Sequence, residues 1–213
     1  GQFDNGLAPD DVLLVGFAKA TVDHLKKLCE EKFNYSSIQT DSIKTIHAYC
    51  YDAIGGDGYQ VLQRSHKKEF KEKLNIDPNN WIKINTAEYD DEEQKEDFAV
   101  WNETEDHKVG LILQLVGLAR HNRTTDLKGL IKYYDSCRNH GYDKLQRDEI
   151  EYVYTQYTHY KKQNNVIDFE DMLHKALSPE VFFDTYKVLI VDECQDLSRL
   201  EWKVVAKLSK NSE

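Results

Sequence analysis

The sequence lacks the features that mark zinc-binding, disulfide-rich and membrane proteins. Its four cysteines are scattered and form no C-x-x-C pair, so we expect neither a zinc site nor a disulfide framework and take a reducing cytoplasm as the simplest setting. The longest apolar run, residues 109–119, is interrupted by two glycines and a glutamine and is too short to span a membrane. No secretory signal is recognisable at the start of the sequence, and we therefore expect a cytoplasmic protein without a membrane partner.

An excess of basic charge is also missing. The chain carries 28 Lys and Arg against 38 Asp and Glu, a net charge of −10, which argues against a protein that holds nucleic acid by bulk electrostatics. A local binding groove remains compatible with this balance, because charge is divided along the chain. Residues 88–106 carry ten carboxylates and one lysine, whereas residues 107–164 carry ten Lys and Arg against six Asp and Glu. We interpret the most acidic part, residues 88–97, as a solvated loop, with a docking site as the alternative.

Three apolar segments predict the strands of a parallel sheet. Residues 12–17 and 188–191 are runs of the kind found in strands buried on both faces, and residues 43–45 are a shorter candidate. Helices are predicted near these strands at residues 18–32, 46–54, 168–177 and 198–210. Asp168 is a candidate N-cap of the third helix, and Ser198 begins a capping box at the fourth. Alternation of strand and helix at these intervals indicates parallel βαβ units.

Between residues 59 and 164 the helix candidates follow one another, at residues 66–74, 107–120, 126–138 and 144–161. The last helix places four side chains on one face: Ile150, Val153, Tyr157 and Tyr160. We interpret this stripe as helix core, with a base-stacking platform as the alternative. The sequence thus predicts an α/β domain in two parts, residues 1–58 and 165–213, and an inserted, mostly helical subdomain at residues 59–164.

Two adjacent acids, Asp192 and Glu193, leave the strand at residues 188–191 directly. In an open α/β sheet, ligands bind at the carboxyl ends of the strands. In NTPases such a pair divides the work, since one carboxylate holds Mg²⁺ and the other orients or deprotonates the attacking water. An acidic turn after a core strand is the alternative for these two residues alone. Gln195 and Asp196 complete Asp-Glu-x-Gln-Asp, which resembles the Walker B box, motif II, of the UvrD/Rep-like superfamily 1 helicases.

Three further stretches resemble the same family. Residues 17–22, Phe-Ala-Lys-Ala-Thr-Val, occupy the place of motif Ia, although Ala18 lacks the hydroxyl found there in relatives. Residues 45–47, Thr-Ile-His, are similar to motif Ib, and residues 168–173, Asp-Phe-Glu-Asp-Met-Leu, are similar to a helix that precedes motif II. The resemblance implies a RecA-like parallel sheet of the P-loop NTPase type with an inserted helical subdomain, which matches the α/β organisation predicted above.

The resemblance also implies roles for individual residues. Motifs Ia and Ib line a single-stranded DNA path in the family, so Phe17 is expected to stack on a base, and Lys19, Thr45 and His47 are expected near phosphates. Core packing is the alternative for Phe17 and an ordinary helix position the alternative for His47. At the nucleotide site, Asp192 is expected to coordinate Mg²⁺ and Glu193 to act on the attacking water. Gln195 and Asp196 are expected to couple that site to neighbouring motifs.

One family element is missing from the sequence. ATP-binding loops of this type read G-x-x-x-x-G-K-[S/T], and here no glycine is followed by lysine. The chain therefore resembles an internal piece of a first motor domain, without Walker A and without the second RecA-like domain, and we expect it not to hydrolyse ATP alone.

The favoured function is part of an ATP- and Mg²⁺-dependent 3′–5′ DNA helicase or translocase of bacterial or phage type, acting on single-stranded DNA and on junctions with duplex. A helicase–nuclease subunit is a close variant. The alternative is a non-enzymatic DNA-binding or protein-docking module derived from a helicase domain.

Overall fold

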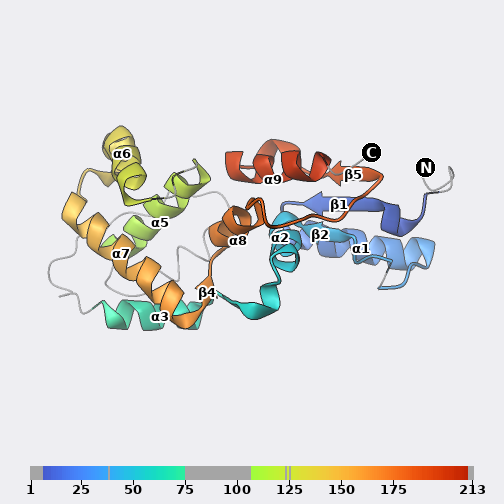
Figure 1. Cartoon of the computed structure of the whole chain (residues 1–213), viewed down its shortest axis with the longest axis horizontal. Helices are drawn as coiled ribbons and strands as arrows, with labels where there is room; N and C mark the ends of the chain where they lie inside the picture. Colours follow the sequence, from blue (N-terminus) through green and yellow to red (C-terminus); the bar gives the residue numbers. More distant parts are fainter. Residues whose placement is uncertain (1–6, 38, 75–106, 123, 125, 211–213) are drawn as a thin grey trace. The chain divides into compact units, whose positions relative to one another are not determined.

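The computed structural model describes residues 7–37, 39–74, 107–122, 124 and 126–210, which fall into two compact units (Figure 1). The first unit comprises Gly1–Gly58 and Phe169–Glu213, and the second comprises Tyr59–Asp168. The acidic run predicted as a loop at residues 88–97 lies outside the described residues. No helix in the described part of the chain is long and apolar enough to cross a membrane.

The first unit is built on a three-stranded parallel sheet in the order β2-β1-β5. The strands are β1 (Val12–Gly16), β2 (Ile43–Thr45) and β5 (Val188–Val191), and all three were predicted. The central strand β1 buries Leu13 and Val15 completely. In the register of the sheet, Val15 pairs with Lys44 of β2 on one side and with Val191 of β5 on the other. The carboxyl ends of the three strands therefore lie at one edge of the sheet.

Helices surround this sheet, and Figure 1 shows α1 (Lys19–Phe33) and α9 (Arg199–Ser209) on opposite sides of β1. Next to α9 lie α8 (Phe169–Ala176) and α2 (Ile46–Ala53), which pack against each other. Four apolar side chains of α9 are buried: Leu200, Val204, Val205 and Leu208. Its predicted capping box is confirmed, because the Ser198 hydroxyl accepts the Glu201 backbone N–H and the Glu201 carboxylate accepts the Ser198 N–H.

The burial predicted for β5 is wrong. All four residues of Val188–Val191 are at least partly exposed, and Ile190 is 42% exposed to solvent. Within the described residues, β5 pairs with β1 alone, so its other edge and part of its faces stay uncovered. A run of aliphatic residues indicates that a strand suits burial on both faces, but neighbouring segments decide whether it is buried.

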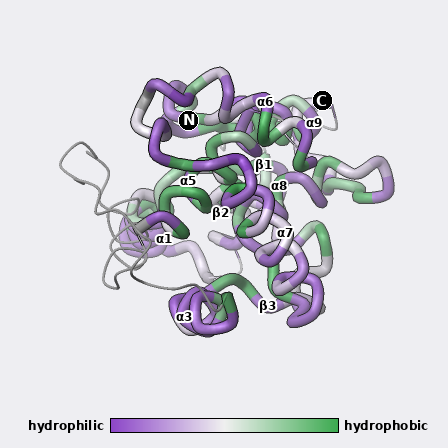
Figure 2. Tube along the Cα trace, turned by 90° about the vertical axis from the view of Figure 1, so that its left-hand side faces the viewer, coloured by the Kyte–Doolittle hydropathy of each residue, from purple (hydrophilic) through white to green (hydrophobic). Residues whose placement is uncertain are grey.

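The second unit is mostly helical, as predicted. Its helices are α3 (Arg64–Lys73), α5 (His107–His121), α6 (Leu127–Cys137) and α7 (Arg147–Asn164), with a short π-helical turn at Arg138–Tyr142. Figure 2 shows α3 as mainly hydrophilic and α5 as mainly hydrophobic, which fits the central place of α5 between α6 and α7. The aromatic stripe of α7 belongs to the core of this unit, and the interpretation as helix core is confirmed.

A two-stranded parallel sheet, which the sequence analysis missed, joins the two ends of the second unit. It pairs β3 (Gln60–Val61) with β4 (Val166–Ile167). The chain enters the unit through β3 and leaves it through β4, so this pairing closes the insertion. Residues 165–168, which the sequence analysis placed in the α/β domain, belong to the compact helical unit. The functional division of the chain into the predicted domains stays a prediction.

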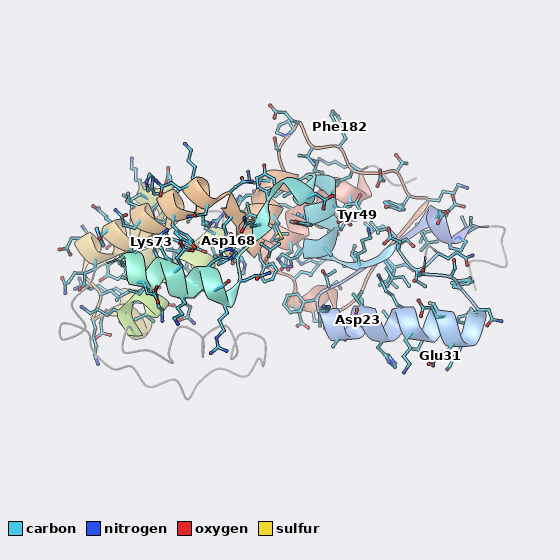
Figure 3. The ribbon with its side chains drawn as sticks, turned by 90° about the horizontal axis from the view of Figure 1, so that it is seen from below. Asp23, Glu31, Tyr49, Lys73, Asp168 and Phe182 are labelled. Carbon is cyan, nitrogen blue, oxygen red and sulfur yellow. The ribbon has the colours of Figure 1, made fainter. Side chains whose placement is uncertain are left out.

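Asp168, the last residue of the second unit, is at the centre of a buried ionic cluster (Figure 3). The residue is only 7% exposed. One guanidinium nitrogen of Arg120 on α5 lies 3.0 Å from each carboxylate oxygen, and on α7 the Tyr157 hydroxyl at 3.0 Å and the Lys161 ammonium donate to the second oxygen. The residue expected to cap α8 thus ties together two helices that are distant in sequence.

Candidate functional site

The predicted site residues gather at the carboxyl edge of the parallel sheet. Gly16 pairs with Thr45, and the Asp192 backbone N–H donates to the Val15 carbonyl at 2.9 Å. Neighbouring strands lie about 4.8 Å apart, so the backbones of Thr45 and Asp192 are about 10 Å apart, with Phe17 leaving the strand between them. The residues expected at the nucleotide and those expected at DNA therefore share one edge.

Glu193 adopts an unusual backbone conformation at this edge. Its φ of 49° and ψ of 40° place it in the left-handed helical region, which costs a non-glycine residue about 1 kcal/mol. The turn that follows, Cys194–Asp196, is a 3-10 helix, and the Asp196 N–H donates to the Glu193 carbonyl at 3.0 Å. Backbone strain of this kind is concentrated at functional sites. Here the left-handed conformation of Glu193 produces a sharp turn of the chain just after β5 ends.

The side chains of this turn are connected to one another. The Gln195 amide donates to the Glu193 carboxylate at 2.5 Å and lies 3.5 Å from the Asp196 carboxylate. Asp192 is half-buried, while Glu193 and Asp196 are exposed. Gln195 can therefore hold the Glu193 carboxylate in place while leaving its second oxygen open to a water molecule. The sequence analysis assigned Gln195 a coupling role and did not foresee this contact.

The donor chemistry of the turn fits a magnesium ion bound jointly with a phosphate. Mg²⁺ prefers carboxylate oxygens and is usually held by one or two of them together with waters and substrate phosphates. Asp192 and Glu193 supply such oxygens at the end of β5. Among the described residues, no three His, Cys, Asp or Glu side chains form a group that could hold a metal ion without such help.

The nucleic-acid candidates lie on the neighbouring strands and helices. Phe17 is half-buried, and Lys19 is exposed at the first turn of α1. Thr45 is the N-cap of α2, where its hydroxyl accepts the Ala48 N–H at 3.1 Å. That hydroxyl keeps its own proton, so it can still donate to a phosphate.

Ala18, where relatives carry a hydroxyl, is the N-cap of α1. Its methyl group makes no side-chain hydrogen bond to the helix. A serine or threonine at such a position usually accepts a backbone N–H of the first turn. The substitution therefore leaves donors at the start of α1 available to another acceptor, next to Lys19.

Phe169 is a further candidate residue that sequence reasoning missed. Its ring lies 5.0 Å from the ring of His47, tilted by 59°, and the residue remains 46% exposed. Its spacing from Met172 and Leu173, both buried, predicts a core position on the same helix face. An exposed aromatic ring beside His47 extends the row of candidate DNA contacts from β1 to α8.

Comparison with known protein families identifies the family of this chain. The UvrD/REP helicase N-terminal domain matches residues 3–213, and a search of curated proteins found no significant match. The match confirms the resemblance inferred from residues 17–22, 45–47 and 188–197, and with it the α/β fold of RecA-like type. The chain belongs to the UvrD/REP helicase N-terminal domain family.

Proposed function

We propose that this chain is the part of an ATP-dependent DNA helicase or translocase that joins ATP hydrolysis to the grip on single-stranded DNA. Family membership supports helicase parentage. The observation that carries the finer proposal is the shared sheet edge, at which Asp192 follows β5 while Thr45 ends β2. A conformational change at the nucleotide-site residues therefore has to be transmitted over only about 10 Å, two strand spacings, to reach the DNA-site residues.

At the nucleotide side, each residue of the turn has a distinct role. Asp192 would hold Mg²⁺ together with the phosphates of ATP, and the ion would neutralise charge on those phosphates. Glu193 orients the attacking water and accepts its proton, and Gln195 fixes the Glu193 carboxylate through the 2.5 Å contact. The same Gln195 amide also lies 3.5 Å from the Asp196 carboxylate. A movement of Gln195 would therefore change its contacts with both Glu193 and Asp196.

At the DNA side, contacts are made without reading sequence. Phe17 and Phe169 supply aromatic faces on which bases stack, and stacking tolerates every base. Thr45, Lys19 and His47 donate hydrogen bonds to phosphates, which position the strand. Local donors and rings suffice for this binding, so the net charge of −10 is compatible with it.

The test of this proposal is Glu193→Gln in the full-length protein. Gln keeps the size and a hydrogen-bonding oxygen but removes the base, so ATP binding is expected to persist while turnover falls at least about 100-fold. ATPase rates and nucleotide binding would be measured with single-stranded DNA present. Glu31→Gln, an exposed change on α1 with the same loss of charge, is the matched control and leaves turnover unchanged. Near-normal turnover of Glu193→Gln would remove Glu193 from its role.

A further inference from the structure

A groove of about 870 Å³ lies in the first unit, at the edge of the sheet opposite the candidate site. Residues just before each strand line it: Asp10 before β1, Ser42 before β2 and Tyr186 before β5. Because the strands are parallel, their amino ends share one edge. Asp192 and Thr45, at the carboxyl edge, do not line the groove.

The groove is strongly acidic. Four carboxylates, those of Asp10, Asp41, Asp52 and Asp184, face one ammonium group, that of Lys44. The Lys44 ammonium lies 3.1 Å from Asp41 and 2.7 Å from Asp52, whereas Asp10 and Asp184 are exposed. A net charge of about −3 repels phosphate groups, and the groove is unsuited to a DNA strand.

The spacing of these carboxylates favours a chain with several cations over a single metal ion. They come from four separate segments: the turn before β1, the α1–β2 loop, helix α2 and the α8–β5 loop. Within the described residues, no three of them converge into a group that could hold a metal. Cationic side chains spread along an extended segment match carboxylates spread along a groove.

An exposed aromatic ring stands at the rim of the groove. Phe182 lies in the loop between α8 and β5 and is 85% exposed. Phe182 and Tyr49 are both labelled in Figure 3. The adjacent Phe183 is buried, with its ring 5.3 Å from the Tyr49 ring in an edge-to-face contact and 4.6 Å from the Lys207 ammonium. The Asp184 N–H donates to the Tyr49 hydroxyl at 3.2 Å.

The base of the same loop is also fixed. The Lys207 ammonium donates to the carbonyls of Ala176, Ser178 and Val181, at 2.8, 2.8 and 2.6 Å. Because the loop is anchored on both sides, its backbone around Phe182 and Asp184 needs less ordering when a partner binds. The exposed Phe182 ring lines the groove together with the carboxylates, so both are accessible to a bound segment.

We propose that this groove binds an arginine-bearing segment of a partner protein. A guanidinium group is planar, so it stacks on the Phe182 ring and at the same time forms paired hydrogen bonds with a carboxylate such as Asp184. A lysine forms the ion pair without the stacking geometry. The partner would thus dock on the motor unit at the edge away from DNA and nucleotide.

The experiment is fluorescence anisotropy of a labelled octapeptide of alternating glycine and arginine against the chain at low salt. Saturable binding is expected, with weaker binding of the lysine version and none of the glutamate version. Phe182→Ala and Asp184→Asn should each reduce affinity about fivefold. Single-stranded DNA binding of both variants should match that of the unmodified chain, because neither residue lies at the DNA edge.

Matched controls separate the groove from general attraction to an acidic protein. Asp23→Asn removes an exposed carboxylate of α1, and Phe33→Ala removes a ring that is 64% exposed on the same unit. Both should leave peptide affinity unchanged. No saturable binding of the arginine peptide, or an equal loss in the control variants, would overturn the proposal.

Discussion

The ionic cluster around Asp168 predicts a large and specific loss of stability when its carboxylate is neutralised. Asp168→Asn preserves the size of the side chain but removes the charge that compensates Arg120 and Lys161. Lys161 is 8% exposed, so it cannot recover its hydration without movement of α7. Removal of one partner from a buried ion pair costs about 3–5 kcal/mol, and we expect about 4 kcal/mol here.

This loss should be confined largely to the second unit. With a urea dependence of about 2 kcal/mol per molar, a 4 kcal/mol loss lowers the unfolding midpoint by about 2 M. Because two units need not unfold together, hydrogen exchange of backbone amides in α5 and α7 is the direct readout. Those amides should lose protection, while the amides of β1 in the first unit keep theirs.

Two further variants test the reasoning. Asp135→Asn breaks an exposed ion pair with Arg147, 2.8 Å apart in the same unit, and should cost at most about 1 kcal/mol. Lys161→Met combined with Asp168→Asn removes the uncompensated ammonium and should recover part of the loss. A loss below about 1 kcal/mol for Asp168→Asn, equal to that of the surface variant, would refute the idea that this cluster holds the helices to β4.

Two other predictions concern thiol reactivity and helix capping. Burial raises the pKa of the Cys50 thiol to about 12, so the reactive thiolate is scarce at neutral pH. When the folded protein is treated with a thiol reagent, the exposed Cys194 should be labelled and Cys50 should not. Rapid labelling of Cys50 would contradict its buried position. Ser198→Ala removes the cap of α9 and should lower the free energy of unfolding by about 1 kcal/mol in urea titrations, whereas Ser198→Asp should restore it; equal stability of all three forms would contradict the capping role.

The sequence predicted the elements that have a clear period or a run of apolar residues. It identified β2 at residues 43–45, and it identified α9 together with its capping box. It missed β3 and β4, because each has two residues and no period can be read from two positions. Those strands exist because segments more than 100 residues apart in the chain meet, which local sequence does not encode.

Only part of the candidate site could be predicted, because local sequence does not encode contacts between distant segments. Motif spacing located Asp192, Glu193 and Thr45, and the parallel register then brought them to one edge. The left-handed conformation of Glu193 has no sequence signal, since glutamate rarely adopts it. Phe169 was hidden by its helical spacing, and only tertiary structure reveals that its ring is exposed beside that of His47.

The measurement that tests the account most directly is anisotropy of a labelled single-stranded oligonucleotide with this chain at low salt. Stacking contributes about 1–3 kcal/mol per base, so Phe169→Ala should weaken binding about tenfold and Phe17→Ala should also weaken it. Phe33→Ala, a ring exposed outside the candidate site, serves as the control. Binding that falls with added salt and is lost selectively in the Phe169 and Phe17 variants is the predicted result. Absence of binding, or equal losses in the Phe33 control, would contradict a DNA path along the carboxyl edge of this sheet.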